Sequence, residues 1–371
     1  MAASSARGSG SVQVTSAPVS ADASWDRFLA AHPAGDVVQS AAWGRTKVSI
    51  GQRARLTVAR RTDGSLVGGA MVVMSRLGAG MHVGYVARGP IVEVGVQDAD
   101  AVFGAIVSQL MGDAHEQQCR LLVVQPSAEV PDDGCLERLG FRLGAPQVSP
   151  DATIRLDLVR SDEELLAAMS PMRRRNVRKA LRSPVVVEAS DDVELFHRLH
   201  RASAARQGFE PRSLEYLRSQ WTVLRPAGIV SILLARVAGA PVAGLWITTF
   251  AGTATYRLPG WDASAGGTAN VNEALHWAVV QRSRAAGCRT YDLGGFDRSM
   301  AERILAGGEP DDEFRRSAGY FKLGFDRAPV LLTRARWIVP GRALRPFASP
   351  LLVRALQSDR GRRLANRLRN G

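Results

Sequence analysis

Basic side chains carry the most pronounced chemical pattern of this sequence, and they are densest in SPMRRRNVRKALRS (170–183), which holds six Arg or Lys and no acidic residue. Ser170 fits the N-cap of a helix, and Pro171 fits its first position. Four cations then share one helix face at the spacing i, i+3, i+4 and i+7: Arg175, Arg178, Lys179 and Arg182. The apolar residues between them are expected to dock the opposite face: Val177, Ala180 and Leu181. Because the positive charge is uncompensated, we expect the cationic face to bind an anion.

Two further lysines are candidates for functional cations. Lys322 lies in GYFKLGF, between aromatic residues and glycines, which is unlike the setting of a lysine on a solvated face. Lys47 closes the segment QSAAWGRTK, where a surface position at a helix end explains it equally well. Lys322 is therefore the stronger candidate for a functional cation.

Other catalytic chemistries find no support in the sequence. It lacks G-x-S-x-G, a Walker A motif, and G-x-G-x-x-G after a strand. His197 and His200 are three residues apart on an expected helix, but no third ligand stands at a recognisable spacing, so we expect a helix surface and no metal site. The three cysteines are odd in number and form no C-x-x-C pair, which argues against disulfides and fits a reducing compartment.

Composition favours a cytoplasmic protein with anionic partners. The net charge is +13, and the sequence has no run of eighteen apolar residues that would span a membrane. Residues 1–23 are small and polar and lack the apolar centre of a signal peptide, so we expect a disordered leader. Residues 326–371 form a basic tail, in which the part from 330 on holds ten Arg against one Asp.

The order of elements repeats along the chain. Residues 56–92 and 232–264 each read as three strands joined by short turns, as in an antiparallel meander. A helix, a Cys-Arg pair, an apolar strand and a Phe-basic-Leu-Gly segment follow each meander, and a pair of helices precedes each. Matching landmarks are offset by 169 to 180 residues. We therefore expect two structurally duplicated lobes, 24–158 and 159–325.

This order predicts an α/β fold with mixed sheets and helices on both faces. It resembles the acyltransferase fold of the acetyl-CoA-dependent N-acetyltransferases, the GNAT fold. The expected architecture is two tandem GNAT-like lobes.

Five segments, in order along the chain, resemble the Fem-type peptidoglycan-bridge aminoacyltransferases, a family of tRNA-dependent transferases. They are VVQSAAWGRTK (37–47), GYVARGPIV (84–92), MRRRNVRKALR (172–182), YDLGGFD (291–297) and SAGYFKLGF (317–325). The second departs from the family's Tyr-x-Pro-Arg-Gly-Pro pattern, because Ala87 replaces the usual proline. The segments cover about 25–330, and the ordered set is more specific than any one of them.

The resemblance implies transfer of an amino acid from aminoacyl-tRNA to an amine on the stem peptide of a peptidoglycan precursor, without a cofactor. Interpeptide bridge formation, cell-wall biogenesis and cell shape would be its context. About fifty residues separate the basic helix from the strand at 230, too few for the coiled-coil arm of some members. The chain therefore resembles the compact, FemX-like members, and we expect a monomer. The amino acid, the acceptor position and the carrier of the muramyl peptide, lipid or nucleotide, stay open.

The resemblance also assigns roles to residues. It implies that Lys322 lies at the reacting centre, near phosphate or the developing oxyanion, and that Lys47 contacts a precursor phosphate. Arg206 and Arg212 are alternative second phosphate contacts, and the cationic helix face would bind tRNA or phosphate. Three further residues are expected to line the cleft: Tyr256, Asn270 and Asp292. Packing, capping or a turn explains those three equally well, so we assign no general base.

The tail has leucines at multiples of four residues and arginines on its other faces. Such a segment suits contact with an anionic bilayer, contact with tRNA phosphates, or disorder. Its return to the first lobe is a further alternative. A bilayer contact would place the protein at the inner face of the plasma membrane, where a lipid-linked acceptor is found.

Two other functions stay open. An acyl-CoA-dependent N-acyltransferase of the GNAT type has the same expected fold, but RLPGWDASAGG (257–267) is too loosely spaced for a pyrophosphate-binding turn. A non-catalytic nucleic-acid-binding protein would explain the basic helix and tail. Aromatic residues do not interleave with those basic runs, however, as single-strand binders require.

Overall fold

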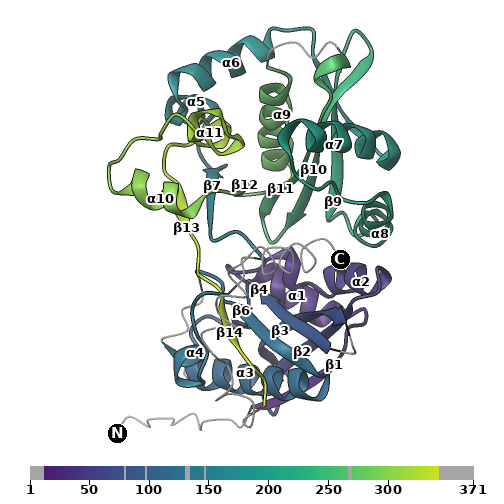
Figure 1. The fold of residues 1–371 in the computed structure, drawn as a ribbon, viewed down its shortest axis with the longest axis vertical. Coiled ribbons are helices and arrows are strands. Elements are labelled where there is room, and N and C mark those ends of the chain that lie inside the picture. Colours follow the sequence, from purple (N-terminus) through teal and green to yellow (C-terminus); the bar gives the residue numbers. More distant parts are fainter. Residues whose placement is uncertain are drawn as a thin grey trace, which may run out of the picture. The chain divides into compact units, whose positions relative to one another are not determined.

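The computed structural model describes residues 12–78, 81–96, 98–129, 134–145, 148–265 and 270–341, which fold as two compact units (Figure 1). Unit 1 holds the described residues up to Arg45, those from Gln52 to 145, and those from Ala335 on. Unit 2 holds Thr46–Gly51 and the described residues from 148 to Arg334. Within these residues each unit contains one seven-stranded sheet with both parallel and antiparallel pairs.

The sheet of unit 1 is built on a meander. β2 (Arg53–Arg60), β3 (Leu66–Gly78) and β4 (Met81–Ala87) pair antiparallel in turn. α3 (Ala99–Glu116) leads to β6 (Cys119–Gln125), which pairs parallel with β4. The other strands are β1 (Gln13–Pro18) beside β2, β5 (Ile91–Val92) beside β3, and β14 (Arg336–Ile338) beside β6. The helices are α1 (Ala23–Ala31), α4 (Cys135–Arg138) and α2 (Ala41–Ser49), of which the last four residues belong to unit 2.

Unit 2 repeats this order. β9 (Val230–Val237), β10 (Ala240–Phe250) and β11 (Thr253–Trp261) form the meander, and α9 (Val271–Ala285) leads to β12 (Thr290–Gly295), parallel to β11. The flanking strands are β8 (Val186–Ser190) beside β9, β7 (Ala152–Asp157) beside β12, and β13 (Val330–Leu331) beside β7. The other helices are α5 (Asp162–Ala168), α6 (Pro171–Leu181), α7 (Val193–Gln207), α8 (Leu214–Leu224), α10 (Arg298–Leu305) and α11 (Ala318–Leu323).

The sequence dictates the repeated meander through its turns. Gly64 and Gly239 adopt φ of +84° and +80°, the left-handed region that tight hairpins need and glycine adopts without strain. The prediction of an α/β fold with two tandem GNAT-like lobes is confirmed. The longest helices described in unit 2, α7 and α9, have 15 residues, so this part of the chain contains no coiled-coil arm.

The structure corrects the expected boundaries of the first lobe. Residues 13–18, expected within a disordered leader, form β1, because this strand satisfies the outer backbone edge of β2. β7, expected to end the first lobe at 158, lies between β12 and β13 in unit 2. Of the expected tail, β13 lies in unit 2 and β14 pairs with β6 in unit 1, while residues 342–371 lie outside the described residues.

The helices of unit 1 correspond to other helices of unit 2 than the sequence predicted. β1 and β8 occupy equivalent sheet edges, beside β2 and β9. The helices that follow these edge strands are α1 and α2 in unit 1, and α7 and α8 in unit 2. α5 and α6, which the sequence analysis matched to α1 and α2, therefore precede the repeat. The basic helix α6 is an addition that unit 1 lacks at the corresponding place in its described part.

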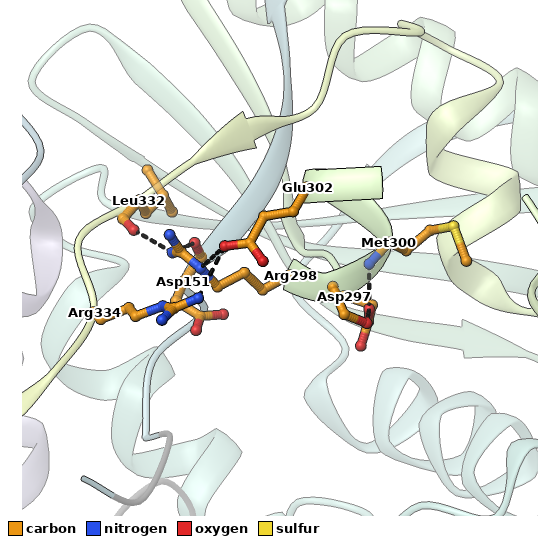
Figure 2. A network of polar contacts seen from close by, with 8 residues as sticks. Asp151, Asp297, Arg298, Met300, Glu302, Leu332 and Arg334 are labelled. Atoms are coloured by element: carbon orange, nitrogen blue, oxygen red, sulfur yellow. Dashed lines mark hydrogen bonds and ion pairs between the residues drawn. The ribbon is translucent and has the colours of Figure 1, made fainter. Parts of the chain in front are cut away.

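Within unit 2, the Arg298 side chain holds the segment that follows α11 against the start of β7 (Figure 2). The Arg298 guanidinium donates to the carbonyls of Asp151 and Leu332 at 3.0 and 2.8 Å, and to Glu302 at 2.8 Å. Arg334 donates to the same Glu302 carboxylate at 2.9 Å. Because the two carbonyls adjoin β7 and β13, the Arg298 side chain holds these strand ends together.

Candidate active site

Lys322 lies on α11 and reaches the end of β12. Its Nζ donates to the Gly295 carbonyl at 2.8 Å and lies 5.6 Å from the centre of the Tyr256 ring. Burial of the ammonium lowers the pKa of Lys322 to about 8, and the carboxylate of Asp292 partly opposes this shift. The structure thus brings together three predicted site residues, which we call the Lys322 cluster: Lys322, Tyr256 and Asp292. A partly desolvated cation is well suited to stabilise negative charge that develops beside it.

The sheet opens next to this ammonium. The parallel pairing of β11 and β12 stops at Thr255 and Asp292. β11 continues along β10 to Trp261, whereas Gly295 of β12 pairs with β7. Gly294, at the opening, has φ of +73°, a conformation that favours glycine. Among the described residues, β11 beyond Thr255 pairs only with β10, and β12 beyond Asp292 pairs only with β7. Lys322 lies at the point where β11 and β12 separate.

Asp292 is engaged by its own neighbours. One carboxylate oxygen accepts from the Thr153 hydroxyl at 2.5 Å and from the Gly294 amide at 2.7 Å. The other accepts from Arg155 Nε at 3.1 Å. The alternative that Asp292 stabilises a turn is thereby supported, and a carboxylate bound by three donors is a poor general base.

The aromatic side chains near the Lys322 ammonium are uncharged. The His276 ring lies edge-on to Tyr256 at 5.0 Å between ring centres, and its Nδ1 is 2.7 Å from the Tyr291 hydroxyl. Burial, together with the nearby cations Arg173 and Lys322, lowers the pKa of His276 to about 3. Burial also raises the pKa of Tyr256 and of Tyr291. At neutral pH the Lys322 ammonium therefore faces uncharged aromatic groups.

A buried ion pair connects the basic helix to the Lys322 cluster. Arg173 of α6 pairs with Glu273 of α9, and both side chains are buried. The guanidinium carbon of Arg173 lies 3.9 Å from the centre of the Phe321 ring and 5.2 Å from that of Phe325. Since these rings bracket Lys322 in the sequence, Arg173 fixes the short helix that carries it.

A second group of cations gathers at Tyr216 of α8, all of it within unit 2. Lys47 Nζ and the Arg212 guanidinium carbon lie 5.0 and 5.1 Å from the centre of the Tyr216 ring. Lys47 is buried, and burial lowers its pKa, so the alternative of a surface lysine is wrong. Burial would raise the pKa of Tyr216, but Lys47, Arg212 and Arg257 lower it below its ordinary value. We call these residues the Tyr216 cluster: Tyr216, Lys47, Arg212 and Arg257.

Arg257 joins this cluster from a β-bulge. The register of β10 and β11 shifts so that Trp246 pairs with Leu258 and Ile247 pairs with Tyr256. Arg257 is the extra residue between them. Bulges re-aim side chains and occur often beside functional sites. Arg257 directly follows Tyr256, so two consecutive residues of β11 belong to different clusters. Tyr256 belongs to the Lys322 cluster, and Arg257 belongs to the Tyr216 cluster.

A neutral histidine positions Arg212. His200 Nε2 accepts the Arg212 amide at 3.1 Å, and Nδ1 donates to the Pro259 carbonyl at 2.6 Å. Burial lowers the pKa of His200 to about 4, so the ring is uncharged at neutral pH. The expected helix-surface position is wrong for His200, which is buried. The guanidinium carbon of Arg206, the other arginine considered as a phosphate contact, lies 3.9 Å from the centre of the Trp261 ring.

Asn270, an expected cleft residue, begins α9 in the left-handed region with φ of +83°. Its side chain makes no capping hydrogen bond, so capping does not explain it. Its Nδ2 is buried and has no hydrogen-bond partner among the described residues. Strained non-glycine backbone of this kind concentrates at functional sites.

The basic helix begins as predicted, because Ser170 accepts the Arg173 amide and Pro171 occupies the first turn. Val177 and Ala180 are buried as expected, whereas Leu181 is 56% exposed, which corrects its expected docking. The four cations of the predicted face are exposed: Arg175, Arg178, Lys179 and Arg182.

The described residues hold no group of three or more His, Cys, Asp or Glu placed to bind a metal ion. None of their helices is long and apolar enough to cross a membrane. The three cysteines are free and buried.

This chain is similar to several known proteins. A family model described as "Acetyltransferase (GNAT) domain" matches residues 170–303. Lipid II:glycine glycyltransferase of Staphylococcus aureus is 26% identical over 227 residues, 57% of this chain and 53% of that protein. The crystal structure of FemX superposes with a TM-score of 0.71 at 17% identity, over 87% of this chain and 96% of that chain. The chain is thus similar in sequence to a lipid II:glycine glycyltransferase and similar in fold to FemX.

The fold of this chain has other solved counterparts. A tandem GNAT protein from the clavulanic acid biosynthesis pathway gives a TM-score of 0.50 at 14% identity, over 89% of this chain and 99% of that chain. The chain spans about half the length of the curated relatives it matches.

Several residues of this candidate site were not predicted from the sequence. Tyr216 follows Arg212 by four residues, one helical turn, and Arg257 adjoins Tyr256, so both stood beside predicted residues. Glu273 and His276 are polar positions three apart in a helix that is otherwise largely buried, a pattern that signals a paired interior group.

Proposed function

We propose that this chain transfers an amino acid from aminoacyl-tRNA to a stem-peptide amine of a peptidoglycan precursor, without a cofactor. The relatives named lipid II:glycine glycyltransferases support this acceptor class. The observation that carries the proposal is the Lys322 ammonium, held on Gly295 where β11 and β12 part. The protein would act in the cytoplasm as a monomer, in interpeptide bridge formation, and so in cell-wall biogenesis and cell shape.

The chemistry requires a cation at the reacting carbonyl. The acceptor amine attacks the ester carbonyl of the donor, an amide bond forms, and the ribose hydroxyl of the tRNA leaves with the proton that the amine gives up. The carbonyl oxygen carries negative charge in between, and a fixed donor or cation beside it lowers the barrier. Lys322 supplies this cation. Asp292 is bound by Thr153, Gly294 and Arg155, so we assign no general base.

The Tyr216 cluster would hold the phosphates of the muramyl precursor. Lys47, Arg212 and Arg257 are three cations around one hydroxyl, and charge-assisted hydrogen bonds to phosphate are strong. Arg206 is the weaker candidate because its guanidinium lies over Trp261. The exposed cations of α6, predicted to bind tRNA or phosphate, suit phosphate groups better than tRNA, because the helix offers no exposed aromatic side chain for base stacking.

One alternative keeps support. The GNAT domain match and the tandem GNAT neighbour favour an acyl-CoA-dependent N-acyltransferase as the second candidate. It would use the same oxyanion stabilisation with a thioester in place of the ester.

A reconstituted assay separates these activities. The full chain is given labelled aminoacyl-tRNA or labelled acetyl-CoA, together with a lipid-linked or a nucleotide-linked muramyl peptide. Label that moves from tRNA to the peptide supports the proposal, and the better acceptor identifies the carrier. Label that moves only from acetyl-CoA supports the alternative. RNA binding without product would favour a non-catalytic nucleic-acid-binding protein and contradict both.

A further inference from the structure

We propose that the outer face of α6, with the start of β8, docks on an anionic lipid surface. This surface, called the α6 face, consists of Met172, Arg175, Arg178, Lys179, Leu181, Arg182 and Val186. The inference goes beyond the transfer reaction, because it concerns where the protein binds and does not depend on what it transfers.

The cations of the α6 face have no acidic partner in the part of the chain that the structure describes. Arg175, Arg178 and Lys179 are exposed on α6, and Arg182 caps its C-terminal end. Within the described residues none of the four forms an ion pair with a carboxylate, although surface arginines elsewhere in unit 2 do. Arg173 of the same helix points inward to Glu273 and does not add to this charge.

Exposed apolar side chains accompany these cations. Met172, Leu181 and Val186 are 43%, 56% and 58% exposed. They are three of the eight large apolar side chains that are exposed in the described residues, and they fall within fifteen consecutive positions. Val177 and Ala180 occupy the buried side of α6. Met172, Leu181 and Val186 therefore do not pack into the core there.

Helical geometry places the two kinds of side chain on one surface. Met172 and Leu181 are nine positions apart, which at 3.6 residues per turn puts them on opposite borders of the exposed arc. The cations lie in the arc between these borders. Val186 begins β8 five residues after Leu181, so it extends the apolar border at the end of the helix.

This combination favours a lipid surface over RNA. Phosphate contacts to RNA need cations but gain nothing from exposed aliphatic groups, and base stacking needs aromatic side chains, which this face lacks. At an anionic bilayer, Lys and Arg bind headgroup phosphates while aliphatic groups enter the boundary beneath them. Charge complementarity and the apolar borders therefore point to the same occupant.

Vesicle flotation tests the proposal with the full chain and no donor or acceptor present. Vesicles of phosphatidylcholine with phosphatidylglycerol are compared with pure phosphatidylcholine at low and high salt. The charge variant carries Arg175→Gln, Arg178→Gln, Lys179→Gln and Arg182→Gln. Because each basic residue near an anionic membrane is worth about fivefold in partitioning, this variant is expected to lose on the order of a hundredfold or more.

Two further variants make the comparison specific. The matched control removes the same charge from exposed arginines elsewhere in unit 2: Arg198→Gln, Arg201→Gln, Arg315→Gln and Arg316→Gln. It is expected to keep partitioning within about fivefold of the original chain. The apolar variant Met172→Ser, Leu181→Ser and Val186→Ser is expected to lose binding severalfold, and this loss should persist at high salt because it is not electrostatic.

The outcomes decide between the occupants. The proposal is overturned if the charge variant and the matched control bind anionic vesicles equally, or if the apolar variant binds like the original chain. It is also overturned if the charge variant loses only tRNA binding in a filter assay, which would make the α6 face an RNA surface. Circular dichroism melts of all variants confirm that they are folded. The two experiments are independent. A negative vesicle experiment does not bear on the proposed transfer reaction, and a negative transfer assay does not bear on membrane docking.

Discussion

Arg173 and Glu273 form a buried ion pair that joins α6 to α9 directly beside the helix that carries Lys322. Asn176, one turn after Arg173, also donates to the Glu273 carboxylate, at 3.2 Å. The Arg173 guanidinium meanwhile packs on the Phe321 ring. One arginine thus satisfies a buried carboxylate and fixes the position of α11.

Removing this arginine is expected to be costly. Arg173→Met leaves the Glu273 carboxylate buried without its charge partner, which typically lowers the free energy of unfolding by about 3–5 kcal/mol. Adding Glu273→Met should restore most of that loss, because a buried pair is often replaceable by apolar groups. Turnover should stay low in the double variant, since α11 has lost its guanidinium contact. Urea denaturation and the transfer assay measure both effects. Arg174→Met serves as the control, and a fall in stability equal to that of Arg173→Met would refute the pair's importance.

Lys322→Ala should abolish turnover while leaving the fold intact. Loss of one oxyanion-stabilising group generally costs about a hundredfold or more in kcat, and the half-buried ammonium here is the candidate for that role. Single-turnover rates with labelled aminoacyl-tRNA test this, with Arg315→Ala as a control at an exposed cation nearby. Near-normal turnover by Lys322→Ala would remove this lysine from the reacting centre.

The rate should respond to pH through Lys322. Burial lowers its pKa to about 8, so the ammonium loses its proton, and the oxyanion its cation, as the pH rises through about 8. The acceptor amine becomes more reactive over the same range, because a lysine-type amine has a pKa of about 10.4. We therefore expect kcat to fall above about pH 8 and not to keep rising. Lys322→Arg should move the decline upward if it retains activity, since guanidinium stays protonated. A rate that rises steadily to pH 10 would contradict a cationic role.

Lys47→Met should weaken acceptor binding. Hydrogen bonds to charged groups contribute about 1.5–3 kcal/mol, so the acceptor KM is expected to rise by about tenfold to a hundredfold. The KM for aminoacyl-tRNA provides the internal control and should stay constant. An unchanged acceptor KM would count against phosphate binding by the Tyr216 cluster.

Stability should fall in mild acid because of His200. Its pKa is about 4 in the fold and about 6.5 when unfolded, so between these values the unfolded chain binds the extra proton. The free energy of unfolding therefore decreases as the pH falls from about 6.5 to about 4, by at most about 1.4 kcal/mol per pH unit for one proton. His276, with a pKa of about 3, acts in the same direction.

Substitution isolates the His200 contribution. His200→Gln should make the decline between pH 6.5 and 4 shallower, whereas His115→Gln, at an exposed position, should leave it as it is. Urea titrations at several pH values give the slopes. Equal slopes for the original chain and His200→Gln would show that this ring is not the titrating group.

The sequence by itself determined the repeated fold and the local start of α6. Turn glycines, alternating apolar strands and an N-cap followed by proline act over a few neighbouring residues, so they can be read without knowing the tertiary structure. The cationic candidate Lys322 was also visible, because a charge between aromatic residues and glycines is unusual, whereas the role of Lys47 came from the family resemblance alone.

Only the tertiary structure decided what those cations contact. Lys47 is buried at Tyr216, Arg212 rather than Arg206 stands beside it, and a β-bulge brings Arg257 to the same hydroxyl. Sequence patterns gave no sign that β7 belongs to unit 2. The physical reason is that strand exchange, bulge register and burial of a charge depend on residues distant in the chain, and their free energies arise only when those residues meet.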